Sequence, residues 1–295
     1  MYEGIEGIEQ DPVEYVVLTG FFLLRLFMRK ACIIPITLLA GFFLFQETTV
    51  SPIIKIQAQT VDQQSVPSQP ISQVTSVNVM DTFAQRADSV LLDAPVVRQM
   101  PELYNGCEVT SLAMLLAASG RPVDKMELAQ KVKKDPTPFK GTSLQKIQEW
   151  GDPNQGFVGD ITGKKKGYGV YNGPLFELLK EYVSVGAVNL TGKDFASLEW
   201  VLSQGNPVVV WTTVSYQPTE RWVSWKKDDQ AIKATFQLHA VLLVGYDENY
   251  VYINDPLPGS KAAKVPKSSF IESWKQLGSQ AVTIVDHEHW YVLNR

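Results

Sequence analysis

The stretch that decides the fold runs from Gln99 to Gly120 and reads QMPELYNGCEVTSLAMLLAASG. Its second half repeats apolar residues at spacings of three and four, which predicts an amphipathic helix that stops at Gly120. Cys107 stands where this helix begins, beside unpaired backbone N–H groups and the positive end of the helix dipole. These surroundings favour a thiolate, so the stretch indicates a nucleophilic cysteine.

A nucleophilic thiol needs a base that titrates near neutrality, and the chain has three histidines: His239, His287 and His289. His239 opens an apolar run with β-branched residues, which predicts the start of a buried strand. A second predicted strand, 250–254, ends at Asp255, so a hairpin would carry Asp255 back towards His239. His239 follows Cys107 by about 130 residues, within the interval of roughly 130 to 150 known from papain-type peptidases.

These segments resemble papain-like cysteine peptidases related to the bacteriocin leader peptidases that cut after double glycine. The resemblance is carried by Gln99, by NGCEVTSLAM at 105–114, by HAVLLVGYD at 239–247 and by YINDP at 252–256. It is greatest to the stand-alone, exported relatives from Gram-positive bacteria, and it covers about Leu91 to the C-terminus. It implies a papain-like fold and hydrolysis of a peptide or related amide bond.

The resemblance also implies a role for each of four residues: Cys107 as nucleophile, His239 as general base and acid, Asp255 as the residue that orients the imidazole, and Gln99 as a side-chain donor to the oxyanion. The chemistry is consistent with these roles, because an imidazole can take the thiol proton and return it to the leaving amine while a carboxylate fixes its tautomer. Asn254 is an alternative to Asp255 for the orienting role.

Glu108 departs from the family pattern, in which glycine most often follows the cysteine. A carboxylate beside the sulfur opposes thiolate formation unless it points away. Two rival functions therefore stay open beside the peptidase: acyl transfer through the same residues, and a surface binding domain that keeps the fold with an inactive site.

Composition and motifs narrow the class of protein. The chain has 295 residues with 45% apolar content, enough for a sizeable core, and a net charge of −4, which gives no reason to expect nucleic acid. No Gly-x-x-x-x-Gly-Lys-Ser/Thr motif occurs, so the ATP-binding part of an exporter is not expected. His287 and His289 alternate on a predicted strand without further ligands, and neither a metal nor a cofactor is expected.

Three segments precede the predicted domain. Residues 1–30 are predicted to be a cytoplasmic segment that ends in basic residues, 31–56 a signal peptide or membrane anchor, and 57–88 a flexible linker. The sequence leaves open whether the apolar segment is cleaved and whether Met1 or Met28 is the start. We expect the protein to be secreted or held at the extracellular face of the cell membrane, where it would meet a peptide or protein substrate.

Residues 89–295 are predicted to form one papain-like α+β domain, a helical lobe followed by an antiparallel sheet lobe, with a cleft between them. The predicted helices after the first are 124–132, 142–150, 174–182, 194–204 and 267–278, with a loop at 151–173. The predicted strands are 90–97, 207–214, the two strands of the His239 hairpin, and 281–285, with a further hairpin within 216–233.

Overall fold

The structure is a computed structural model that describes residues 86–286 and 289, all within a unit that begins at Ile71. The segments predicted at 1–30 and 31–56, most of the linker at 57–88, and His287 fall outside the described residues. In the part of the chain that is described, no helix is long and apolar enough to cross a membrane.

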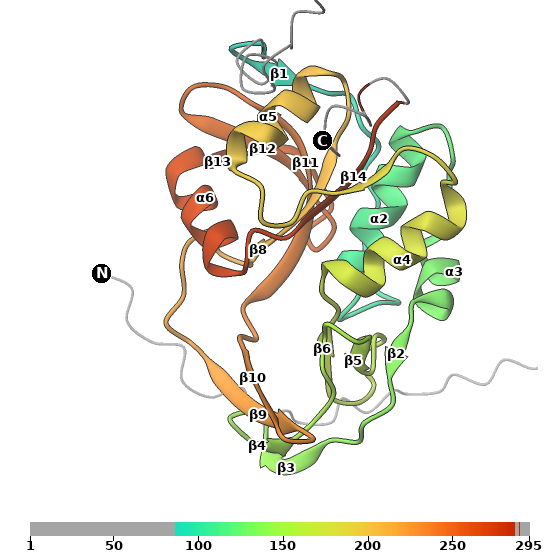
Figure 1. The fold of residues 1–295 in the computed structure, drawn as a ribbon, viewed down its shortest axis with the longest axis vertical. Coiled ribbons are helices and arrows are strands. Elements are labelled where there is room, and N and C mark those ends of the chain that lie inside the picture. The colour runs from blue at the N-terminus through green and yellow to red at the C-terminus, as the bar shows by residue number, and fades with distance from the viewer. Residues whose placement is uncertain (1–85, 287–288, 290–295) are drawn as a thin grey trace, which may run out of the picture. The chain divides into compact units, whose positions relative to one another are not determined.

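A seven-stranded antiparallel sheet organises the domain (Figure 1). Its order is β13-β12-β11-β8-β14-β7, and β1 pairs with β11. The strands are β1 (Val90–Leu91), β7 (Ala187–Asn189), β8 (Val208–Thr213), β11 (Leu238–Tyr246), β12 (Tyr250–Asp255), β13 (Ser260–Pro266) and β14 (Ala281–Ile284). All of β8 and nearly all of β11 are buried, as expected for central strands covered on both faces.

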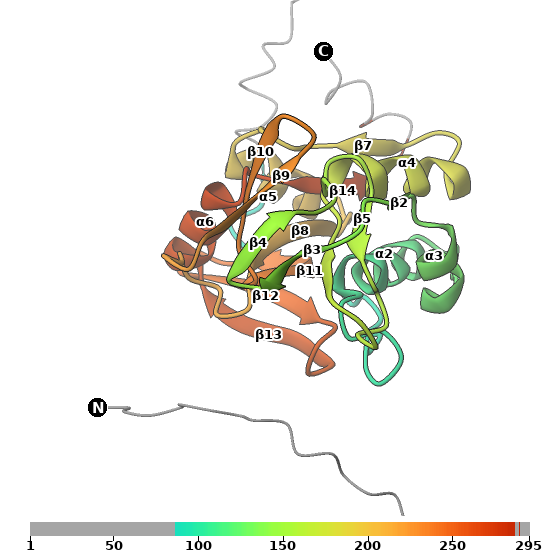
Figure 2. The ribbon, with the colours of Figure 1, turned by 90° about the horizontal axis from the view of Figure 1, so that it is seen from below.

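Helices cover both faces of this sheet (Figure 2). On one face lie α2 (Cys107–Ala118), α3 (Lys125–Lys131) and α4 (Asn172–Tyr182), and on the other α5 (Phe195–Ser203) and α6 (Lys267–Gln276). Because successive residues of a strand point to opposite faces, β11 contributes to both cores. Ala240 and Leu242 join the core under α2, whereas Val241 and Leu243 join the core under α5 and α6. Helices on both faces of an antiparallel sheet make the domain α+β, as the sequence predicts.

Two smaller sheets lie together at one end of the domain (Figure 1). One has the order β10-β9-β4-β3 and the other β2-β5-β6. Their strands are β2 (Lys134–Asp135), β3 (Lys140–Ser143), β4 (Lys146–Glu149), β5 (Phe157–Gly159), β6 (Gly167–Gly169), β9 (Val223–Lys227) and β10 (Gln230–Ala234). A third apolar cluster joins the two sheets, with the rings of Trp150 and Trp225 centred 5.7 Å apart.

This end of the domain corrects two predictions. The helix predicted at 142–150 is wrong, because these residues belong to the β3–β4 hairpin, in which Ile147 is buried between exposed neighbours and Glu149 pairs with Lys226 of β9. The loop predicted at 151–173 is also wrong in part, since it contains β5 and β6 and begins the helix α4. Burial of Phe157 against the core outweighs the glycine-rich composition that indicated a loop.

Helix α2 also differs from its prediction, because it is buried on all sides rather than amphipathic. Glu108, Thr110 and Ser111 are buried with the apolar residues of the helix. The hydroxyl of Thr110 donates to the carbonyl four residues earlier, and the Ser111 hydroxyl donates to the Ala240 carbonyl at 3.1 Å, so their polar groups are satisfied. Gly120, with φ of +72°, follows the helix at its predicted end.

Most other predicted elements are confirmed. Asp124 and Asp194 cap α3 and α5 by accepting hydrogen bonds from backbone N–H groups of the first turn. Helices α4 and α6, strands β8, β11, β12 and β14, and the β9–β10 hairpin lie close to their predicted positions. The predicted strand 90–97 shortens to β1, because the chain beyond Leu92 leaves the sheet towards Pro95, which has no N–H to donate.

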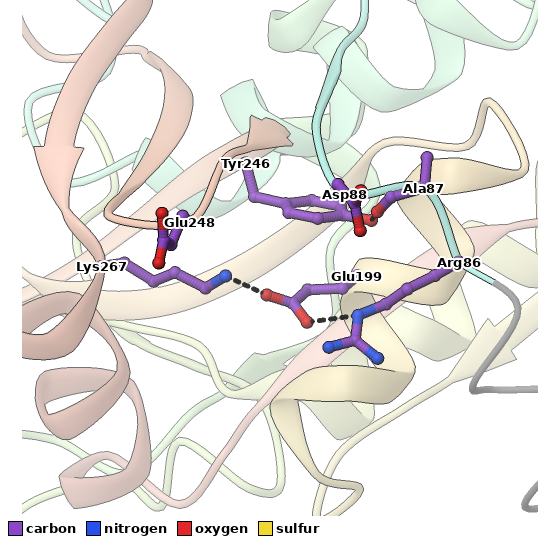
Figure 3. A pocket seen from close by; sticks show the side chains of 7 residues that line it. All are labelled: Arg86, Ala87, Asp88, Glu199, Tyr246, Glu248 and Lys267. Atoms are coloured by element: carbon purple, nitrogen blue, oxygen red, sulfur yellow. Dashed lines mark hydrogen bonds and ion pairs between the residues drawn. The ribbon is translucent and has the colours of Figure 1, made fainter.

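Paired charges fix the described chain where it enters the domain (Figure 3). Glu199 of α5, whose side chain is 5% exposed, accepts from Arg86 Nε at 2.9 Å and pairs with Lys267 of α6. The hydroxyl of Tyr246 donates to the Ala87 carbonyl beside this pair. Residues 86–87 are therefore held against β11, α5 and α6.

Candidate active site

Cys107 is the first residue of α2 and follows a tight turn. The Gly106 N–H donates to the Leu103 carbonyl at 3.0 Å, and a β-carbon added at Gly106 would lie 2.6 Å from the Leu103 β-carbon. Glycine is therefore required for the chain to close this turn and begin the helix at Cys107. The Cys107 side chain is 8% exposed, and its backbone N–H, at the helix start, has no intrahelical acceptor.

Cys107, His239 and Gln99 line one cavity of about 250 Å³. Residues from the turn before α2 and from the start of β11 meet here, so the cavity lies where the helical layer meets one end of the sheet. Three of the four residues predicted from the sequence thus share one cavity, and the fourth, Asp255, contacts His239.

The rim of this cavity is apolar and exposed. In the described part of the chain, six large hydrophobic side chains are exposed, and four of them line this cavity: Met100, Tyr104, Val214 and Leu257. An apolar rim around a polar centre is the usual composition of a ligand site.

His239 and Asp255 form a buried pair at the end of the β11–β12 hairpin. Leu242 pairs with Asn254, which places Asp255 opposite Val241 and on the same face as His239. His239 Nε2 lies 2.8 Å from Asp255 Oδ1. Because Asp255 accepts at Nε2, the other ring nitrogen, Nδ1, is left to exchange a proton with a partner in the cavity.

Asp255 is held as a carboxylate. Burial alone would raise the pKa of Asp255. The hydrogen bond and charge of His239, the Tyr216 hydroxyl and the Leu257 N–H together outweigh burial, so the pKa of Asp255 is lowered. The Leu257 N–H donates to Oδ1 at 2.8 Å, and the Tyr216 hydroxyl donates to Oδ2. An ionised Asp255 can therefore accept the hydrogen bond from His239 Nε2 and fix the orientation of the ring.

Tyr216 is a site residue that sequence reasoning missed. It lies 39 positions before Asp255, between β8 and β9, in a segment whose local pattern carries no signal for a contact with the carboxylate. Its backbone has φ of +60°, which is uncommon for a residue with a side chain, so the surrounding structure maintains this position.

Asn254, the sequence alternative for orienting the imidazole, serves another contact. Its side-chain amide donates to the carbonyls of Ala94 and Pro95 at 3.0 and 3.1 Å, and its carbonyl accepts from the Ala262 N–H at 2.8 Å. Asn254 therefore holds the chain that leads to α2, and Asp255 is the neighbour that contacts His239.

Gln99 lines the cavity, but its amide is engaged with the turn before α2. Nε2 donates to the carbonyls of Leu103 and Tyr104 at 3.2 and 2.9 Å, and Oε1 is buried without a hydrogen-bond partner. Donation to an oxyanion requires the amide to release one of these carbonyls. The predicted oxyanion role of Gln99 stays a prediction.

The thiol of Cys107 is held by Glu108. Sγ donates to Glu108 Oε2 at 3.4 Å, and no hydrogen bond between Sγ and the His239 ring is present among residues 86–286 and 289. Burial and then the Glu108 charge raise the pKa of Cys107 well above its usual value, against a smaller lowering by the Ala240 N–H. The thiol is therefore protonated in this form of the site.

His289 does not line the cavity that holds Cys107. His289 Nδ1 lies 2.8 Å from Asp286 Oδ1, and its ring packs edge-on to Trp200. Within the described ranges, no group of three or more His, Cys, Asp or Glu side chains is arranged to hold a metal ion.

Comparison with known proteins identifies the family. Residues 91–282 match the Peptidase_C39-like family. The uncharacterized protein YvpB of Bacillus subtilis is 38% identical over 264 residues, which cover 87% of this chain and 98% of YvpB.

The crystal structure of a proposed C39-like peptidase from Bacillus anthracis is 42% identical with a TM-score of 0.62, covering 68% of this chain and 99% of that one. A double glycine motif protease from an AMS/PCAT transporter, solved with its leader peptide, is 18% identical with a TM-score of 0.35, covering 66% of this chain and 92% of that one. The chain belongs to the Peptidase_C39-like family, whose fold is that of the papain-like cysteine peptidases.

Proposed function

We propose that the protein is an exported thiol peptidase that hydrolyses a peptide or related amide bond through an acyl-enzyme on Cys107. The observation that carries this proposal is the buried His239–Asp255 pair, whose imidazole lines the same cavity as Cys107. A paired imidazole beside a cysteine at a helix start is the arrangement that generates a sulfur nucleophile. Membership of the Peptidase_C39-like family supports the same reaction.

The first half of the reaction forms a thioester. The Cys107 proton passes to Nδ1 of His239, and Sγ attacks the carbonyl carbon of the scissile bond, whose electron pair moves to the oxygen. The Cys107 N–H and the Gln99 amide, once turned from its carbonyl partners, donate to this oxyanion. His239 then returns the proton to the leaving nitrogen as the C–N bond breaks and the thioester remains.

The second half releases the acyl group by hydrolysis. His239 takes a proton from water, whose oxygen attacks the thioester carbonyl, and the C–S bond breaks. The proton returns to Sγ, so the free enzyme is restored. Throughout, Asp255 accepts from Nε2 and stabilises the imidazolium without taking the proton itself.

The cavity also supports a substrate class. Met100, Tyr104, Val214 and Leu257 surround the thiol with exposed apolar surface. A peptide with apolar side chains near the scissile bond would bury this surface on binding, which favours association. The apolar segment within 31–56, which follows basic residues, supports export. The substrate would then be a peptide or protein outside the cell. If the segment is not cleaved, it would hold the protein at the membrane.

A second function, a binding domain with an inactive site, is favoured by one observation. Cys107 is protonated and hydrogen-bonded to Glu108 rather than to His239. Such a domain would use the apolar rim to hold a peptide without cleaving it.

The test uses the full chain in three forms: wild type, Cys107→Ala and His239→Ala. Each is incubated with a proteome-derived peptide library, and new peptide ends are read by mass spectrometry. The peptidase proposal predicts cleavage by wild type alone, and cleavage by Cys107→Ala would overturn it.

Alkylation by iodoacetamide at pH 6 to 7, with the adduct mapped to Cys107 rather than Cys32, separates the two functions. If wild type is labelled fast and His239→Ala much more slowly, the enzyme is supported. If both are labelled slowly and at the same rate, the binding domain is supported.

A further inference from the structure

Glu108 is a fully buried carboxyl group beside the sulfur, and the reaction above does not use it. Its side chain is 0% exposed. Oε1 accepts from the Val170 N–H at 3.0 Å, and Oε2 accepts from Cys107 Sγ at 3.4 Å. A charged or titrating group is costly to bury, so one placed against a nucleophile calls for an explanation.

The surrounding chain forms a fitted site for this carboxyl group. Gly169 leaves the necessary space, because a β-carbon there would lie 2.3 Å from Glu108 Oε1. Val170, which donates its N–H to Glu108, is itself fixed by Trp211, whose Nε1 donates to the Val170 carbonyl at 2.9 Å. Gly169 of β6, Val170 just after it and Trp211 of β8 therefore hold Glu108 in one orientation, with its second oxygen on the thiol.

Among the titratable groups around Glu108, the Cys107 thiol is the one that forms a hydrogen bond with it. On its own helix, Glu108 contacts Cys107. Besides burial, the Glu108 charge raises the pKa of two nearby phenols, those of Tyr168, in β6, and Tyr171, just after β6. Burial is the largest cause that raises the pKa of both phenols, so both are neutral near pH 7. His239 and Asp255 on β11 and β12 pair with each other, and no lysine, arginine or histidine forms an ion pair with Glu108 within the described residues.

We propose that Glu108 is a positioning residue for the nucleophile: its ionised carboxyl group holds the Cys107 thiol proton away from His239, and its protonated form releases the sulfur for ionisation. Ionisation of the thiol beside a carboxylate places two negative charges together, which is unfavourable. When Glu108 takes a proton from solvent, its O–H can donate to the thiolate while His239 holds the thiol proton. The inference rests on the proposed function of Cys107 as nucleophile. Burial raises the pKa of Glu108 from 4.5 to about 7, so both forms are accessible near neutrality.

The experiment measures the rate of Cys107 alkylation by iodoacetamide in the full chain, with peptide mapping to separate Cys107 from Cys32. Glu108→Gln removes the charge and keeps the shape, and Glu108→Asp keeps the charge. We expect Glu108→Gln to react about tenfold faster than wild type at pH 7, the effect of one unit in thiol pKa. Glu108→Asp is expected to stay within about threefold of wild type. The matched control Glu177→Gln, at an exposed position of α4, leaves the rate unchanged.

Two outcomes of the alkylation experiment overturn the inference. An unchanged or slower rate in Glu108→Gln shows that the carboxylate does not restrain the thiol, and equal acceleration in Glu108→Gln and Glu108→Asp shows a packing effect. A second measurement needs only wild type: the infrared band of the Cys107 S–H group should shift as a buried carboxyl band titrates near pH 7. Independent titration of the two bands overturns the inference even where Glu108→Gln does not fold. Failure of the peptidase proposal is separate, since it is read from Cys107→Ala on peptides and from alkylation of His239→Ala.

Discussion

His239 Nε2 and Asp255 Oδ1 lie 2.8 Å apart, and each side chain is only 3% exposed. The two residues are adjacent because β11 and β12 form an antiparallel hairpin whose register places both on one face. This pair fixes which ring nitrogen faces the cavity.

Asp255→Asn should lower kcat for peptide cleavage by up to about 10⁴-fold, the loss known for a catalytic triad whose orienting carboxylate becomes an amide. The amide keeps the size of the side chain but neither balances the imidazolium charge nor enforces the tautomer that presents Nδ1 to the cavity. Initial rates with a cleaved library peptide measure the effect. Asp229→Asn, at an exposed position, should match wild type, and an Asp255→Asn rate within about threefold of wild type would remove Asp255 from the mechanism.

Tyr216→Phe should move the acid limit of kcat/KM to higher pH, because the Tyr216 hydroxyl is one of the donors that lower the pKa of Asp255. The folded pKa of Asp255 lies below its unfolded value, so its contribution to stability is present above about pH 4 and is lost as the pH falls through the folded pKa. At pH 7 the variant should lose about 1 to 3 kcal/mol of unfolding free energy.

A pH–rate profile and urea unfolding measure the two effects of Tyr216→Phe. Tyr182→Phe is the matched control, since Tyr182 donates to the exposed carboxylate of Glu127 at 2.8 Å. It should cost less than about 1 kcal/mol and leave the pH–rate profile in place. Identical behaviour of the two variants would argue against a special role for Tyr216.

Glu108→Gln should remove a pH dependence of stability. The folded pKa of Glu108, about 7, lies above the reference value of 4.5, so its favourable contribution is complete below about pH 4.5 and is lost as the pH rises through 7. Across that window wild type should lose about 3 kcal/mol relative to the variant. Urea unfolding at pH 4.5, 6, 7 and 8 measures the difference, with Glu177→Gln expected to parallel wild type. A constant difference at all four pH values would contradict the raised pKa.

Glu199→Gln should destabilise the domain by about 1 to 3 kcal/mol, because it leaves Lys267, whose side chain is 19% exposed, without its carboxylate partner. The Arg86 side chain is 38% exposed, so water replaces much of its interaction with Glu199. Residues 86–87, which Glu199 holds through Arg86, should also become accessible to proteases. Urea unfolding and limited proteolysis at the start of the domain are the measurements. Cleavage of cavity-bound peptides should persist in the folded fraction, since Glu199 does not line the active-site cavity.

Local sequence signals were sufficient for several elements. Asp124 and Asp194 mark helix starts because each carboxylate accepts a hydrogen bond from a backbone N–H in the first turn of the helix it caps. The two partners are two or three residues apart in sequence, so the contact can be predicted locally. The apolar run after His239 predicts a buried strand for a similar reason. By contrast, residues 142–150 fit a helix or a hairpin locally, and pairing with β3 and with Lys226 of the distant strand β9 favours the strand.

Three features could be predicted from the order of residues alone: the helix that starts at Cys107, the strand that begins near His239, and the hairpin that brings Asp255 back to His239. Each depends on residues close to one another along the chain. Three contacts could not be predicted in this way: Glu108 with the thiol, Gln99 with the turn before α2, and Tyr216 with Asp255. These contacts join segments that are distant in sequence, or depend on how the core surrounds a side chain, and neither periodicity nor capping encodes them. The physical reason is that a helix buried on every side leaves the direction of each polar group to the packing around it.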